Sequence, residues 1–331
     1  MARLLALNAR AFANRIWVVD NSGSMVITDG HRFSPTSDGN MTEIRVSRWE
    51  ELQETIMYHA EMAGVLNSPT VFRLLNDPGP LVGPQEFSVA QSPPGVGDVQ
   101  EDIRKIRTYI RRAEPLGVTP LTSHILQIQE ALHHMAPKLR REGKRVAVIL
   151  ATDGLPTDEE GFVSEDITEE FVRALKSMEG LPIWLVIRLC TDEKKVTDFY
   201  NSLDGRFNLS LDVLDDFVGE AKEVHRHNKW LNYSMPLHRC RELGYHDRLF
   251  DLIDERPLTK RELRRFCGLL FGYKVDQIPD PDTDWKNFVS FIVEHVALEP
   301  YQYNPIKKKR LPLIRVHALN KLYGQKICAI M

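Results

Sequence analysis

A short apolar run that ends abruptly in polar, turn-forming residues constrains the fold of this chain more than any other feature. Residues 16–19 are all apolar, and Asp20, Ser22, Gly23 and Ser24 follow them. Consecutive apolar positions are typical of a strand that is buried on both faces, as in a parallel sheet. Gly23 lets the loop turn tightly, so one carboxylate and two hydroxyls at every second position can face a common centre. Such hard oxygen ligands suit Mg²⁺, Mn²⁺ or Ca²⁺.

Two distant segments offer further oxygen ligands. The sequence predicts a helix that has Thr119 at its N-cap and Pro120 at its first helical position. Residues 146–151 form a second apolar strand, which runs into Asp153. Because the carboxyl ends of parallel strands share one rim of a sheet, we expect Asp20 and Asp153 to lie together there, with Thr119 beside them.

In these three pieces the chain resembles the von Willebrand factor A (vWA) domain family. The metal-ion-dependent adhesion site of that family is written Asp-x-Ser-x-Ser, then a distant Thr, then a distant Asp-Gly. All five positions match here: Asp20, Ser22, Ser24, Thr119 and Asp153. The resemblance covers about residues 15–228. It implies that the hydroxyls contact the metal and that the aspartates bind it directly or through water. It also implies an open coordination position that a carboxylate of a protein partner fills. In the structural alternative, Thr119 is only a helix cap and the polar loops are only turns.

The remaining pattern predicts two parts of different character. Apolar strands alternate with amphipathic helices over residues 15–228, which is typical of an α/β, doubly wound, mostly parallel Rossmann-like sheet. We expect a mainly α-helical extension of unknown family over residues 229–331 and a leader over residues 1–14. Residues 1–228 carry 25 basic and 34 acidic side chains, whereas residues 229–331 carry 18 and 12. This shift from a net charge of −9 to +6 predicts different partners for the two parts.

A long polar stretch, residues 29–46, separates the predicted metal loop from the first helix. That helix is expected to begin at Ser47, where Glu50 completes a capping box. We expect residues 29–46 to form an irregular loop on the metal rim and, with the acidic loop 155–165, to select the partner. An inert surface excursion is the alternative.

The sequence lacks two common motifs of catalytic sites. It contains neither a Gly-x4-Gly-Lys-Ser/Thr motif nor a His-Glu-x-x-His motif. A Mg²⁺-dependent phosphotransferase or phosphatase of the haloacid-dehalogenase type also places an Asp after its first strand. That chemistry needs a second Asp two residues later as general acid, and Ser22 stands there. We therefore expect a non-catalytic adaptor whose metal captures an Asp or Glu of a partner. A scaffold with a vestigial metal site, acting through residues 229–331, is the second alternative.

Basic residues of the extension suggest other partners less strongly. Arg261, Arg264 and Arg265 could lie on a DNA-reading helix, but solvated basic faces are far commoner, so no nucleic acid is expected. The basic cluster 307–310 could be a nuclear signal or touch an anionic surface; an exposed charged loop is the preferred interpretation.

Cysteine usage and hydropathy predict where the protein resides. The four cysteines lack a Cys-x-x-Cys spacing and are interpreted as reduced, mostly buried thiols: Cys190, Cys240, Cys267 and Cys328. No apolar run approaches transmembrane length, and residues 4–6 are too short for a secretory signal. We expect a cytoplasmic protein. A nuclear location stays open, as does an organelle transit peptide in the acid-free residues 1–15.

Overall fold

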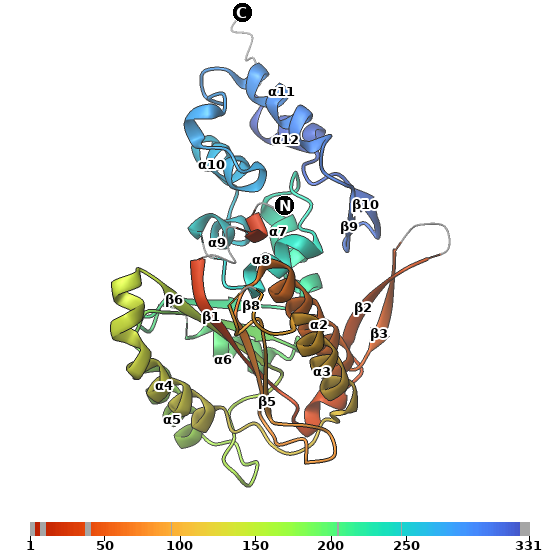
Figure 1. Cartoon of the computed structure of the whole chain (residues 1–331). Helices are drawn as coiled ribbons and strands as arrows, with labels where there is room; N and C mark the ends of the chain where they lie inside the picture. Colours follow the sequence, from red (N-terminus) through yellow and green to blue (C-terminus); the bar gives the residue numbers. More distant parts are fainter. Residues whose placement is uncertain are drawn as a thin grey trace, which may run out of the picture.

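A six-stranded sheet forms the centre of the protein (Figure 1). The computed structural model describes residues 4–6, 11–36, 41–93, 95–203, 205–245 and 247–324. Strand order is β5-β4-β1-β6-β7-β8, with parallel pairing from β4 to β8 and an antiparallel edge strand β5. The strands are β1 (Phe12–Val19), β4 (Thr70–Leu74), β5 (Glu86–Val89), β6 (Arg145–Thr152), β7 (Ile183–Leu189) and β8 (Leu211–Leu214). The predicted α/β, mostly parallel sheet is confirmed.

Helices cover both faces of the sheet. Side chains of β1 alternate between two cores, so that Trp17 and Val19 face one layer of helices and Val18 faces the other. The first layer contains α2 (Arg48–Leu66) and α3 (Val99–Arg112). The second contains α4 (Leu121–Glu142), α5 (Glu165–Lys176) and α6 (Lys194–Asn201). This arrangement explains why the central strands are apolar at consecutive positions.

Local signals placed the starts of two helices with different accuracy. The capping box of Ser47 and Glu50 is present at the start of α2, as predicted. The prediction for α4 was wrong by one residue, because Pro120 and not Thr119 occupies the N-cap. The backbone N–H of Thr119 instead donates to Oγ1 of Thr157 at 3.0 Å. This bond ties the Thr119 loop to the loop that follows β6.

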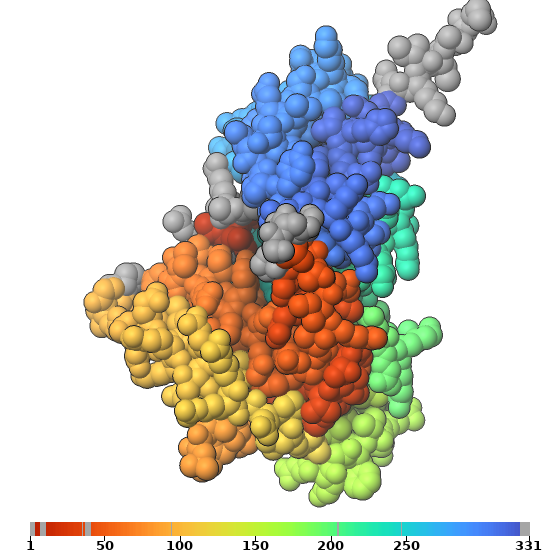
Figure 2. All heavy atoms as spheres, turned by 90° about the vertical axis from the view of Figure 1, so that its right-hand side faces the viewer, coloured from red at the N-terminus to blue at the C-terminus, as the bar shows by residue number. Residues whose placement is uncertain are grey.

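Residues 29–46 are not an irregular rim loop, and that prediction was wrong. They contain a β-hairpin of β2 (Gly30–Pro35) and β3 (Met41–Val46), whose register runs from Gly30↔Val46 to Pro35↔Met41. Residues 37–40 of the predicted loop lie outside the described residues. The hairpin starts beside the rim but extends away from it to the C-terminal region (Figures 1 and 2). Phe33 packs against Phe217 at 5.3 Å and Tyr303 at 5.4 Å between ring centroids, and these contacts fix its direction.

The C-terminal region is mainly helical, as predicted. Thr259 and Glu262 form a capping box at the start of α10 (Lys260–Phe271). A small antiparallel pair, β9 (Gln302–Asn304) and β10 (Lys309–Leu311), was not predicted. The helices are α7 (Phe217–His227), α8 (Met235–Glu242), α9 (Arg248–Glu255), α10 (Lys260–Phe271), η2 (Val275–Gln277), α11 (Trp285–Val296) and α12 (Val316–Tyr323). None of the helices in the described ranges is both long and apolar enough to cross a bilayer.

The two parts share a hydrophobic core. Leu4 and Leu5, from the predicted leader, and Phe217 of α7 belong to the same buried cluster as Trp230 and Phe266. Nε of Arg15, in β1, donates to the carbonyl oxygen of Leu243 at 3.1 Å. The C-terminal region therefore packs near the amino end of β1, opposite the rim that holds Asp20. The sheet itself begins at Phe12, within the predicted leader, of which residues 1–3 and 7–10 lie outside the described residues.

Candidate metal centre

Three loops meet at the carboxyl ends of β1 and β6. The backbone N–H of Asp20 donates to the carbonyl oxygen of Ala151 at 2.9 Å, which joins the two strand ends. The N–H of Gly23, in η1 (Gly23–Val26), donates to the carbonyl of Gly117 at 3.1 Å. This bond holds the Asp20 loop against the loop that carries Thr119. The predicted convergence of the three segments at one rim is therefore observed.

The five predicted residues form one group of oxygen atoms at this rim. Oγ of Ser22 lies 3.0 Å from Oγ of Ser24, whose hydroxyl donates to Oδ1 of Asp153 at 2.8 Å. Thr119 is buried beside Gly154, where an added Cβ would lie 3.6 Å from its Oγ1. Ser22, Thr119 and Asp153 are buried, and Ser24 is half-buried.

Asp20 is completely buried and is held by two donors. Its Oδ1 accepts the backbone N–H of Ser22 at 2.8 Å, and its Oδ2 accepts the Thr152 hydroxyl at 2.6 Å. Burial raises the pKa of Asp20 to about 6, and the negative charge of Asp153 adds to the rise, against the opposing effect of these hydrogen bonds. Two carboxylates thus share a buried site, where a cation would stabilise the ionised form of both.

Arg48, the first residue of α2, completes the rim and was missed by the sequence analysis. Its Nη1 donates to Oδ2 of Asp153 at 2.7 Å, while Nε and Nη2 donate to the two oxygens of Asp29 at 2.7 and 2.6 Å. Burial would lower the pKa of Arg48, but the two carboxylates outweigh it and raise that pKa. Arginine in the first turn opposes the helix dipole. Its presence there was the signal in the sequence for a specific acidic partner.

The donor set fits a small hard cation. Adjacent ligands of an octahedral Mg²⁺ with bonds of about 2.0–2.1 Å are about 3 Å apart. The oxygens of Ser22, Ser24 and Asp153 show neighbouring spacings of 3.0 and 2.8 Å. The described residues contain no group of three or more His, Cys, Asp or Glu side chains placed to hold a metal. The rim differs from such a group because it offers two carboxylates together with three hydroxyl groups.

Other candidate residues have structural partners. Arg264 donates to the carbonyl oxygen of Ile278, and Arg265 forms an ion pair with Asp247 at 2.6 Å. Arg264 and Arg265, two of the three arginines considered for DNA reading, therefore contact other residues of the C-terminal region. The predicted buried thiols Cys190, Cys240 and Cys267 are buried, and Cys328 lies outside the described residues.

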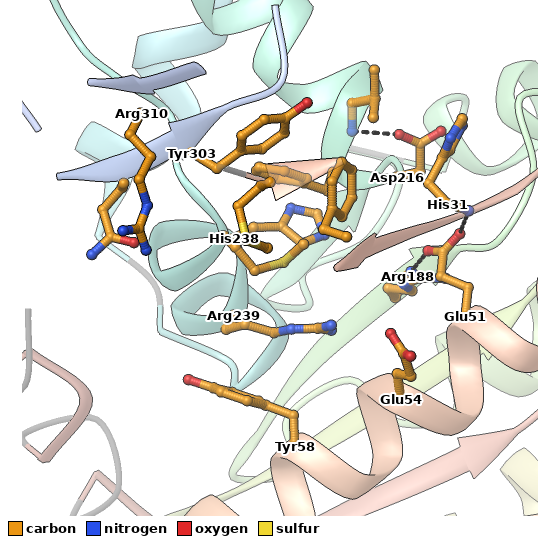
Figure 3. Close-up of a pocket in the computed structure, with 16 residues that line it drawn as sticks. His31, Glu51, Glu54, Tyr58, Arg188, Asp216, His238, Arg239, Tyr303 and Arg310 are labelled. Carbon is orange, nitrogen blue, oxygen red and sulfur yellow. Dashed lines mark hydrogen bonds and ion pairs between the residues drawn. The ribbon is translucent and has the colours of Figure 1, made fainter. Parts of the chain in front are cut away.

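A cavity of about 330 Å³ lies between α2, the hairpin and the C-terminal region (Figure 3). Glu54 and Tyr58 line it from α2, Arg239 from α8 and Tyr303 from β9. The guanidinium of Arg239 lies 5.3 Å from the centroid of the Tyr58 ring. Because these elements are far apart in the sequence, no local pattern could have predicted this cavity.

Comparison with known proteins gives a distant structural likeness and no match by sequence. No known family matches the sequence, and no curated protein matches it. The chain is similar to the crystal structure of the SpRpn10 VWA domain, with a TM-score of 0.38 and 13% sequence identity. The alignment covers 62% of this chain and 87% of that chain. The interpretation of the rim therefore depends on its own geometry.

Proposed function

We propose that this rim binds Mg²⁺, or Mn²⁺ or Ca²⁺ in its place, and through the ion captures an Asp or Glu side chain of a protein partner. One observation carries the proposal. Three segments far apart in the sequence bring Asp20, Asp153 and three hydroxyl groups to the same edge of the sheet. Hydroxyl ligands are neutral, so a bound cation would keep part of its charge available for an acidic partner.

Neighbouring residues would orient the two carboxylates for binding the ion. The Thr152 hydroxyl and the Ser22 N–H orient the Asp20 carboxylate, and the Ser24 hydroxyl orients Asp153. Arg48 donates to the second oxygen of Asp153, and both side chains are buried. The irregular loop after β6 follows Asp153 and would contact the partner, whereas the β2–β3 hairpin extends away from the rim.

Thermal unfolding of the chelator-stripped protein tests the metal site. Titration with Mg²⁺, Mn²⁺ or Ca²⁺ should raise the melting temperature of the wild type, because an ion that binds the folded state stabilises it by mass action. The same titration of Asp20→Ala should give no rise. Absence of a rise in the wild type at millimolar concentrations of every ion would overturn the proposal.

Partner capture is tested separately, with proteins that bind the immobilised wild type. Partners should be retained in Mg²⁺ and released by chelator, and Asp20→Ala should retain none of these metal-dependent partners. A partner that stays bound in chelator would not use the metal.

A scaffold with a vestigial metal site is the second candidate, and one observation favours it. Arg48 already pairs with Asp153 at 2.7 Å, so the rim carries a positive charge of its own. The two candidates predict different results for Mg²⁺ and an Arg48→Met variant: Mg²⁺ should restore stability if the rim binds the ion, and should have no effect if the site is vestigial. The enzymatic alternative requires Mg²⁺-dependent turnover of a generic phosphate ester that Asp20→Ala removes.

A further inference from the structure

A basic cleft of about 670 Å³ opens between the end of α7 and α12, in the C-terminal region. Five of its lining residues are lysines or arginines: Arg226, Lys229, Lys307, Arg315 and Lys321. Three histidines also line it, and its described lining includes no Asp or Glu. A cleft whose charges all have one sign raises the local concentration of ions of the opposite sign.

Backbone contacts bring the two sides of this basic cleft together. Leu231 and Ile314 form an isolated antiparallel bridge. The Arg315 N–H donates to the Trp230 carbonyl at 2.7 Å, and Nη1 of Arg315 donates to the Lys229 carbonyl at 3.3 Å. Residues that are about 85 positions apart in the sequence are thereby fixed side by side. Both α7 and α12 lie above the sheet, away from the metal rim (Figure 1).

The cations of the cleft have few acidic neighbours. Arg226 reaches Glu223 at 3.9 Å, but among ion pairs between described residues none involves Lys229, Lys307 or Arg315. Burial lowers the pKa of His225 in this cleft, and the positive charges of Lys307, Lys229 and Arg315 lower it further. The neighbouring Lys308, by contrast, pairs with Glu43 at 3.4 Å. The cleft therefore holds mutually repelling charges that an anion would relieve.

We propose that the basic cleft binds a compact small molecule bearing several phosphate groups, either free or as the headgroup of a lipid. Five cations around one opening exceed what a single carboxylate needs, and phosphate oxygens accept strong hydrogen bonds from both Arg and Lys. The cleft has the size of a small-molecule site. Single-stranded nucleic acid would instead need exposed aromatic rings for base stacking, and Trp230, the one Trp, Tyr or Phe among the described lining residues, is fully buried.

Calorimetric titration of the full chain with inositol hexakisphosphate tests this site. The wild type should bind the probe saturably and less tightly at high salt. The double variant Lys307→Glu/Lys321→Glu changes two exposed side chains and should weaken binding by at least about tenfold, because it reverses two of the five charges. The control Lys176→Glu/Lys195→Glu alters net charge equally on exposed positions of α5 and α6, and should change the affinity by less than about threefold.

Vesicles distinguish the two sources of the phosphates. Sedimentation with phosphatidylcholine vesicles that contain phosphatidylinositol bisphosphate would identify a lipid headgroup, provided phosphatidylserine vesicles of equal charge sediment less protein. Binding of the soluble probe alone would identify a free ligand. Equal loss of binding in the cleft and control variants, no saturable binding to any probe, or tighter binding to an RNA oligonucleotide would overturn the proposal.

Discussion

Two buried clusters of charge in this protein differ in how their charges are compensated. Beneath α8, Glu242 accepts from Nη1 of Arg239 at 2.7 Å and from His59 at 2.9 Å, and lies 3.4 Å from Nε of Arg188. Arg188 also pairs with Glu51. Two carboxylates and two guanidinium groups thus balance one another. At the rim, Asp29 and Asp153 share the single guanidinium of Arg48, and the buried Asp20 beside them forms no ion pair with a described residue.

The difference indicates which cluster is structural and which is suited to binding. Burial would raise the pKa of Glu242, but Arg239 and the neighbouring histidines lower it well below its usual range. The pKa of Asp20 moves the other way, to about 6. A buried cluster whose charges balance needs nothing from outside, whereas one with surplus carboxylates is stabilised by a cation or by a proton.

The largest expected effect comes from breaking the balanced cluster. Glu242→Gln would leave Arg239 and Arg188 buried with a surplus of positive charge, and should lower the free energy of unfolding by about 3–5 kcal/mol. Urea denaturation measures this loss, and Mg²⁺ should not restore it. A loss below about 1 kcal/mol would show that this cluster is not what holds α8 to α2.

A smaller effect is expected from Arg48→Met at the rim. The variant leaves Asp153 without its counter-charge, so in chelator it should be less stable than the wild type by about 2–3 kcal/mol. Mg²⁺ should then stabilise the variant more than the wild type, because the ion replaces the lost positive charge. If urea denaturation shows no recovery in Mg²⁺, the rim is vestigial and the scaffold alternative gains support.

The smallest change in stability is expected at a third buried cluster, which also serves as a control for the metal site. Around Arg241, the carboxylates of Glu220, Asp212 and Asp254 also outnumber the single guanidinium. Burial raises the pKa of Asp254 to about 6 against the lowering effect of Arg241, and the nearby acidic side chains add to the rise. Here a proton can relieve the surplus charge.

The raised pKa predicts a direction for the pH dependence. Since the pKa of Asp254 is higher in the folded than in the unfolded protein, its contribution to stability is present below about pH 4 and is lost as the pH rises through 6. Relative to Asp254→Asn, the wild type should lose about 1–2 kcal/mol between these values in urea denaturation. Asp254→Asn should keep the Mg²⁺-dependent rise in melting temperature. Loss of that rise would indicate that the metal binds at this cluster and not at the rim.

Signals within short stretches of sequence determined the sheet and the composition of the rim. The apolar run of β1 required burial on both faces, which in turn predicted parallel neighbours whose carboxyl ends share an edge. The capping box at Ser47 predicted a helix start, because it depends only on residues three positions apart. Because the carboxyl ends of parallel strands share one edge, the sequence also placed Asp20 and Asp153 together.

Tertiary structure alone decided the features that depend on distant contacts. The polar stretch 29–46 forms a hairpin whose direction is set by Phe33 against Phe217 and Tyr303, on elements almost 200 and 300 residues away. Arg48 joins the rim because α2 starts next to the end of β6, and the basic cleft exists because residues near 230 pair with residues near 314. The energy of such contacts comes from burial and charge pairing across the fold, which no local pattern encodes.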